Sequence, residues 1–251
     1  MPVVGILFII GLALLAAAAT FTVERLVPAK KRQEHNDVVG FVYAVIGVIY
    51  AVLLGLVVIT TWSTLEEARA NTYTECDSLI WLDWYAYSLP QPQHTEIEDL
   101  LKQYTREVIT VEWPELAHQG SSPEAWSTYQ ELHKLIAVQR PTTAADVAQY
   151  QLAVDAADQL GAARRERLAQ SGESVPPLLW VALILGGVIT VGFAFFFGMK
   201  STGVHALVMF SVTLLIGGLL LVIYEINYPF AGIKVGPEAL QLALERMQEL
   251  S

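Results

Sequence analysis

Five small residues give the most informative spacing in this chain. Gly40, Ala44, Gly47, Ala51 and Gly55 recur at steps of three or four residues, and such steps place side chains on one face of a helix. In lipid, a face of small residues lets helices approach closely. Around the axis of an oligomer, the same face would bring the backbone near a permeating ion. The pattern therefore fits two roles, close helix packing and the lining of an ion pathway.

Larger side chains of the same segment extend the pathway hypothesis. Tyr43 and Tyr50 lie seven residues apart and share a neighbouring face, where they would serve as pore aromatics or pack inside a helix bundle. We expect the narrowest part of a pathway between Gly47 and Gly55. The candidate pore-lining residues are Gly47, Tyr50, Ala51, Leu54 and Gly55.

A second group of candidates follows the last apolar segment. Glu225 and Asn227 lie where that segment meets water, and Phe230 comes shortly after. Repeated around an oligomer axis, Glu225 would form a ring of acids that favours cations. The alternative is an interfacial capping cluster. Glu225, Asn227 and Phe230 are the candidate pore-mouth residues.

Signatures of enzymes and of metal sites are missing from the sequence. There is no phosphate-binding glycine loop and no Gly-x-Ser-x-Gly turn. The five histidines are scattered, without a Cys/His pair at zinc spacing, so we expect them on the surface. The sequence therefore predicts no enzyme, no metal and no cofactor, and its single cysteine, Cys76, excludes a disulfide within the chain.

The composition is that of a membrane protein. Of the 251 residues, 54% are hydrophobic and 16% are charged, against about 25% charged in soluble domains. Residues 64–175 hold 8 basic and 18 acidic side chains, which accounts for the whole net charge of −10. An acidic region repels phosphates, so nucleic acid is not an expected partner.

Four stretches are long enough and poor enough in charge to cross a bilayer, which needs about 20 residues. They are Pro2–Val23, Val38–Trp62, Pro177–Met199 and Val204–Tyr224. The predicted fold is an all-α integral membrane protein with four transmembrane helices and a helical extramembrane insert between the second and third. The expected parts are 1–62, the first helix pair; 63–176, the acidic insert; 177–228, the second helix pair; and 229–251, an amphipathic tail.

The insert is predicted to contain four helices. The second span has no breaker after Trp62, so we expect it to continue to Pro90 with a buried stripe of Leu65, Ala68, Thr72, Leu79, Leu82 and Ala86. The acidic side chains of this helix are expected on a solvated face, where they could attract cations; they are Glu66, Glu67, Glu75, Asp77 and Asp83.

The other helices of the insert are marked by their ends. A second helix is expected to close at Glu112-Trp113-Pro114, and a third to open at the Ser122 cap. A fourth is expected to open at Pro141-Thr142-Thr143. A short tail helix is expected after Pro237, with Leu240, Leu242, Leu244 and Met247 on its apolar side.

The orientation in the membrane follows from the basic residues. Arg25, Lys30, Lys31 and Arg32 lie in the short loop between the first two spans, and such loops stay in the cytoplasm. This favours an extracytoplasmic insert, while the basic run 164–167 before the third span favours the opposite side.

Several runs together resemble the bacterial bestrophin-like domain family. They are Asn36-Asp37-Val-Val-Gly40-Phe41, Gly47-Val-Ile-Tyr50-Ala-Val-Leu-Leu-Gly55, Glu112-Trp113-Pro114, Arg164 to Arg167, and Pro229-Phe230-x-Gly232. More distantly, Trp62 with Glu67-Ala68-Arg69, and Asn227 with Pro229-Phe230, are similar to segments of the bestrophin ion channels.

This resemblance implies a pentameric, passive ion channel in the bacterial inner membrane, with the second span lining the pore and the insert in the cytoplasm. It implies anions as the cargo, whereas Glu225 and the acidic insert favour cations. Because Ile233-Lys234-Val235 stands where animal bestrophins carry an acidic run, we expect no calcium gating. The expected partners are further copies of the chain, membrane lipid and inorganic ions. The alternative function is a non-conducting membrane sensor or scaffold whose insert binds a partner or ligand.

Overall fold

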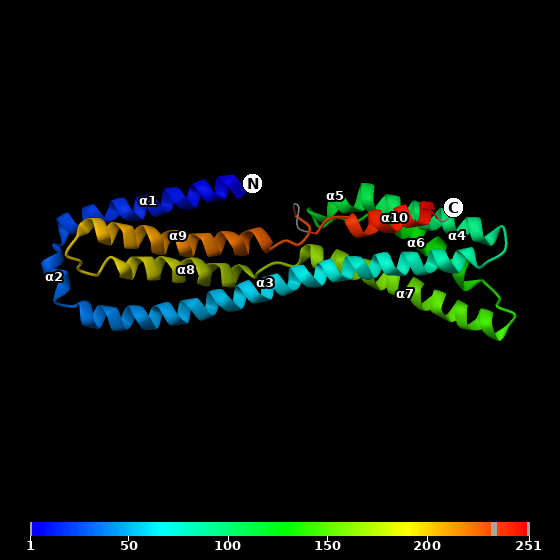
Figure 1. Ribbon diagram of the computed structural model, residues 1–251, viewed down its shortest axis with the longest axis horizontal. Coiled ribbons are helices and arrows are strands. Elements are labelled where there is room, and N and C mark those ends of the chain that lie inside the picture. Colours follow the sequence, from blue (N-terminus) through cyan, green and yellow to red (C-terminus); the bar gives the residue numbers. More distant parts are fainter. Residues whose placement is uncertain (1, 232–234, 250–251) are drawn as a thin grey trace. The chain divides into compact units, whose positions relative to one another are not determined.

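The computed structural model describes residues 2–231 and 235–249, and every regular element within these ranges is helical (Figure 1). This confirms the predicted all-α class. In chain order the elements are α1 (Pro2–Leu26), α2 (Ala29–Gln33), α3 (Asn36–Tyr87), α4 (Gln93–Glu107), a π-helical turn (Val108–Glu112), α5 (Trp113–Leu116), α6 (Pro123–Ala137), α7 (Ala144–Gly172), α8 (Pro177–Ala194), α9 (Thr202–Ile226) and α10 (Glu238–Glu249).

Within the described ranges, four helices are long and apolar enough to cross a membrane, as predicted. They are Val3–Leu26 of α1, the whole of α3, α8 and α9. Helix α3 has 52 residues, about 78 Å at 1.5 Å per residue, so only part of it fits the hydrocarbon layer of about 30 Å.

The chain divides into two compact units. One contains residues 1–62 and 174–227, and the other contains residues 63–173 and 228–251. We call them the spanning unit and the extramembrane unit. Helix α3 contributes to both, because the boundary falls between Trp62 and Ser63.

In the spanning unit, α1 packs along α9, and α8 also contacts α9. Figure 1 shows α1 and α3 on opposite sides of α8 and α9. Glycines allow the α1–α9 approach: a Cβ atom on Gly217 would lie 2.8 Å from the Ile9 side chain, and one on Gly5 would lie 2.7 Å from Leu221. A larger residue at either position would push the helices apart.

In the extramembrane unit, the predicted stripe of α3 forms one wall of the core. All six of its residues, from Leu65 to Ala86, are at most 5% exposed. Ile97, Leu101 and Tyr104 of α4 are fully buried, and α6 and α10 both contact α4.

Local signals explain most helix ends. The Ser122 hydroxyl accepts the Ala125 amide at 3.1 Å, so α6 begins at the predicted cap. Helix α7 begins at Ala144, directly after the expected opening at Pro141-Thr142-Thr143, where Thr143 and Asp146 form a reciprocal capping box.

Two predictions about the helices need correction. The second helix of the insert does not close at Pro114: a π turn over Val108–Glu112 leads into α5, which holds that proline in its first turn, where its missing amide is tolerated. In α10 the buried side is Ala239, Leu240, Ala243 and Met247, whereas Leu242 is 42% exposed.

Candidate functional site

The five candidate pore-lining residues of α3 fall into two groups. Tyr50 and Leu54 are 5% and 6% exposed and belong to the core of the spanning unit, together with Val57, Leu183 and Ile223. The Tyr50 hydroxyl donates to the Leu183 carbonyl of α8 at 2.9 Å. These two side chains therefore hold α3 against α8 inside their own chain, which is the packing role that the sequence left open for Tyr50.

Gly47, Ala51 and Gly55 lie on a different side of α3. Ala51 and Gly55 are exposed and Gly47 is half-buried. A Cβ atom on Gly47 or Gly55 would meet no atom within 4 Å among the described residues. The small-residue face is thus open in the single chain from Ala44 to Gly55, and it is available to lipid, to another copy or to a conduit.

The three pore-mouth candidates also differ in burial. Asn227 is 4% exposed, and its side-chain oxygen accepts the Val175 amide at 2.7 Å, which fixes the entry to α8. Phe230 is 5% exposed and packs edge-to-face on Trp113, with ring centroids 5.6 Å apart. Only Glu225 of the three keeps part of its side chain exposed. Gly232, which the sequence grouped with Phe230, and the Ile233-Lys234 pair lie outside the described residues.

The basic loop between the first two spans makes structural contacts with the loop after α8. Arg32 is 7% exposed, and its guanidinium donates to the Phe195 and Phe197 carbonyls at 2.9 and 2.7 Å and pairs with Glu24. Asn36 exchanges two hydrogen bonds with the backbone of Gly198, at 3.0 and 2.9 Å. The loop after α1 and the loop after α8 are therefore tied together at one end of the spanning unit.

One histidine departs from the surface location expected for all five. His205 is 1% exposed, and its Nε2 lies 3.0 Å from the Ala194 carbonyl oxygen, so it joins the start of α9 to the end of α8. Among residues 2–231 and 235–249, no group of histidine, cysteine and acidic side chains could hold a metal ion.

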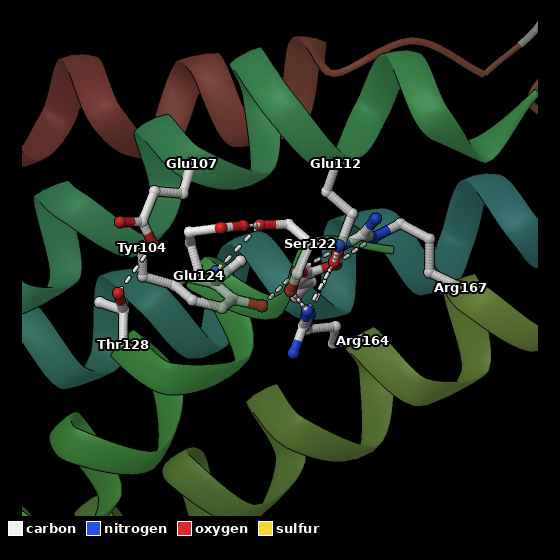
Figure 2. A network of polar contacts seen from close by, with 10 residues as sticks. Tyr104, Glu107, Glu112, Ser122, Glu124, Thr128, Arg164 and Arg167 are labelled. Atoms are coloured by element: carbon white, nitrogen blue, oxygen red, sulfur yellow. Dashed lines mark hydrogen bonds and ion pairs between the residues drawn. The ribbon is translucent and has the colours of Figure 1, made fainter. Parts of the chain in front are cut away.

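The interior of the extramembrane unit holds a network of charges that the sequence did not reveal. Figure 2 shows Glu112 between Arg164 and Arg167. Arg164 donates from Nε and Nη2 to the two carboxylate oxygens of Glu112 at 3.1 and 2.5 Å. Arg167 donates to Glu112 at 2.9 Å and to both oxygens of Glu75 at 2.7 and 3.1 Å.

Neutral groups complete this network. Tyr104 donates its hydroxyl to Glu75 at 2.8 Å. The Ser122 amide donates to Glu112 at 2.9 Å, and the Ser122 carbonyl accepts from Arg164 at 3.0 Å. The two guanidinium planes lie over indole rings, Arg164 over Trp126 and Arg167 over Trp113, at 5.1 and 5.2 Å from the ring centroids. These contacts offset part of the cost of burying both cations.

The pKa values follow from these contacts. Burial acts to raise the pKa of Glu112, but the Arg164 hydrogen bond, the Arg167 charge and the Ser122 amide outweigh it and hold that pKa below its ordinary value. Burial and the Glu75 charge raise the pKa of Tyr104 well above its ordinary value. At physiological pH Glu112 is therefore ionised and Tyr104 is neutral, which suits a structural core rather than proton transfer.

This network corrects the expected solvated face of the extramembrane part of α3. Glu75 is fully buried in the network and Asp83 is 6% exposed, whereas Glu67 and Asp77 are exposed. A signal for the basic partners was present in the sequence: Arg164 and Arg167 continue, at three-residue steps, the core side of α7 that includes Leu160 and Gly161. Charge alone led to the wrong prediction for Glu75.

Known proteins with a similar fold are membrane proteins, and they resemble this chain along its whole length. A crystal structure described as that of a membrane protein superposes with a TM-score of 0.74 at 14% identity and covers 98% of each chain. Two variants of a bacterial bestrophin homolog from Klebsiella pneumoniae superpose with TM-scores of 0.71 and 0.70 at 15% identity, and cover 97% and 96% of this chain and 98% of theirs. No curated protein is significantly similar in sequence.

The sequence itself carries the family assignment. The Bestrophin-like domain matches residues 10–240, a range that includes most of both units and the open face of α3. With the bestrophin fold present over the same residues, this chain belongs to the bestrophin-like family.

Proposed function

We propose that this protein is a homo-oligomeric ion channel, pentameric by resemblance to the bestrophins, that conducts inorganic ions passively along an axis bordered by α3. In such a channel, Gly47, Ala51 and Gly55 would line the conduit or contact neighbouring copies. Tyr50 and Leu54 support that face from behind by fixing α3 to α8.

The observation that carries the proposal is the open small-residue face of α3 in a chain of the bestrophin-like family. A single chain with four spans has its core between the helices, filled by Tyr50, Leu54, Val57, Leu183 and Ile223. A path for ions within one chain is therefore blocked by packed side chains. A path between copies needs an unfilled face, and α3 offers one from Ala44 to Gly55.

The mechanism needs no titratable group in the membrane. The apolar stretches predicted to span the membrane hold no Asp, Glu, Lys or Arg, which weighs against proton-coupled transport. An apolar neck that dewets and wets could gate passive flow. Glu225, partly exposed in the last turn of α9, would bias the sign of the entering ion if copies bring it around the axis.

The experiment is ion flux from liposomes together with the mass of the purified oligomer. We expect flux above that of empty liposomes, loss of flux in Ala51→Trp and Gly55→Trp, and normal flux in Gly11→Trp. Gly11 is a matched control, because it is an exposed glycine on α1 where a Cβ atom would meet no described atom within 4 Å. A monomeric protein, or full flux in both α3 variants, would refute the proposal.

One observation favours a second candidate, a non-conducting membrane sensor. A half-open cavity of about 630 Å³ lies in the extramembrane unit between the α3–α4 connection, the end of α6 and the start of α7. Gln93 lines it, and the Gln93 side-chain oxygen is buried without a hydrogen-bond partner among the described residues. An assembled oligomer that conducts no ion under any tested condition would favour this sensor over the channel.

A further inference from the structure

The spanning unit contains a groove that the proposed pathway does not use. It has a volume of about 400 Å³ and lies between α1, α8 and α9, with walls that include Leu15 and Ala16, Val188 and Val191, and Ile216. None of its described lining residues comes from α3. Because α1 and α3 lie on opposite sides of α8 and α9 (Figure 1), the groove is separate from the face that the channel assigns to neighbouring copies.

One polar side chain lines this apolar groove. Thr213 of α9 is 4% exposed, and its hydroxyl is buried without a hydrogen-bond partner among the described residues. Other hydroxyls of the spans donate to the carbonyl four residues earlier, as Thr20, Thr190 and Ser211 do at 3.2, 2.7 and 2.9 Å. Thr213 lacks this intrahelical bond.

A hydroxyl without a hydrogen bond, such as that of Thr213, is energetically unfavourable inside a membrane. In hydrocarbon there is no water to satisfy it, and burial of a hydroxyl without a hydrogen bond is unfavourable. An occupant that brings an oxygen atom to Thr213 would remove that cost, and the alkyl part of such an occupant would match the apolar walls.

The depth of Thr213 identifies the class of occupant. It lies eleven residues after the start of α9 at Thr202, about 16 Å along the helix and near the middle of a hydrocarbon layer of about 30 Å. The ester groups of a phospholipid lie at the interface and would bring only alkyl chain to this depth. A second copy offers Ser211 as an outward hydroxyl, and that group already donates to its own helix.

We propose that this groove binds a small lipophilic alcohol or carbonyl compound dissolved in the bilayer, with its oxygen atom hydrogen-bonded to Thr213. The site lies beyond the proposed channel activity, and binding is measured without ion flux.

The test is photolabelling of the full-length protein in liposomes with the diazirine probe 3-azioctanol, followed by mapping of the labelled peptides. We expect labels on α1, α8 and α9 beside the groove. At equal mole fraction in the bilayer, 1-octanol should compete more strongly than n-octane. Thr213→Val should reduce groove labelling about fivefold, the loss typical of one hydrogen bond.

Two further variants keep the test decisive. Thr190→Val removes a hydroxyl that is already bonded to Gly186, and should leave labelling unchanged. Gly192→Leu should fill the groove, because Gly192 lines it and a Cβ atom there meets no described atom within 4 Å; labelling should be lost.

Three results would overturn the site: equal labelling of Thr213→Val and wild type, labels spread evenly over all spans, or equal competition by 1-octanol and n-octane. A disulfide formed between copies by Gly192→Cys in a Cys76→Ala background would also overturn it, because the groove would then be occupied by another subunit.

Discussion

Two acidic and two basic side chains lie in the interior of the extramembrane unit, and each pairs with a side chain of the opposite kind. Glu75 and Glu112 face Arg164 and Arg167, and all four are at most 1% exposed. Buried pairs gain little net stability from their attraction, but removal of one partner leaves an uncompensated charge. Of the two acids, Glu112 is the one that bonds both arginines.

We therefore predict that Glu112→Gln lowers the free energy of unfolding of this unit by about 3–5 kcal/mol, measured by thermal or denaturant unfolding of the purified protein. Glu249→Gln is the control, since Glu249 pairs with Arg246 on the surface, where the two side chains are 65% and 59% exposed. The control should change stability by less than about 1 kcal/mol. Equal effects of the two substitutions would contradict the structural role of the network.

Asp83 gives the same unit a dependence on pH. Burial, and then the charge of Glu98, raise the pKa of Asp83 to about 6, although Lys102 and His94 act in the opposite direction. The folded state then holds a proton on Asp83 between its ordinary pKa of 3.8 and about 6. Because the unfolded state has lost that proton, the free energy of unfolding falls as pH rises through this window.

We predict that the stability of wild type depends more strongly on pH than the stability of Asp83→Asn. From pH 4 to pH 6.5, wild type should lose about 2 kcal/mol more stability than Asp83→Asn, as measured by unfolding at each pH. Identical pH profiles would show that Asp83 titrates normally in the folded protein.

Single residues were the hardest to predict from the sequence. The pattern of apolar side chains identified the buried stripe from Leu65 to Ala86, because periodicity reports which side of a helix is apolar. The burial of Glu75 and of His205 depends on partners in other helices. Periodicity in one helix carries no information about those partners.

Helix α3 has two environments along one uninterrupted element. Its first part packs on α8 through Tyr50, and its second part packs its stripe into the extramembrane core. The continuity was predictable, because no proline or glycine follows Gly55 until Pro90. The contact between α3 and α8 was not predictable from α3 alone. It depends on Gly186 of α8, where a Cβ atom would lie 2.5 Å from the Tyr50 ring.

Gly186→Ala should therefore destabilise the spanning unit by about 1–3 kcal/mol through overpacking against Tyr50. Gly218→Ala is a matched control on α9, since a Cβ atom there meets no described atom within 4 Å. Thermal unfolding in detergent distinguishes the two. A neutral Gly186→Ala would mean that α3 and α8 do not approach as closely as described.

The basic loop gives a prediction about the orientation of the whole molecule in the membrane. The cluster Lys30 to Arg32 favours an extracytoplasmic insert. Cys76 is unsuitable as a probe, because it is 2% exposed and burial raises the pKa of its thiol to about 11. An exposed position such as Glu131 on α6 is a better one.

Glu131→Cys in a Cys76→Ala background should react in intact cells with a membrane-impermeant maleimide, as read by mass shift. The same variant in opened cells gives the full signal. Reaction only after opening would place the insert in the cytoplasm and contradict the orientation predicted from the loop.

The channel hypothesis is tested most directly at the face of α3 from Ala44 to Gly55. In the Cys76→Ala background, Gly55→Cys carries a single accessible thiol on that face, and Gly11→Cys carries one on α1. Both are reconstituted in liposomes, treated with a bulky thiol reagent, and checked by mass for complete modification before ion flux is measured. We predict that modification blocks flux through Gly55→Cys and leaves flux through Gly11→Cys intact; undiminished flux through fully modified Gly55→Cys would contradict a pathway bordered by α3.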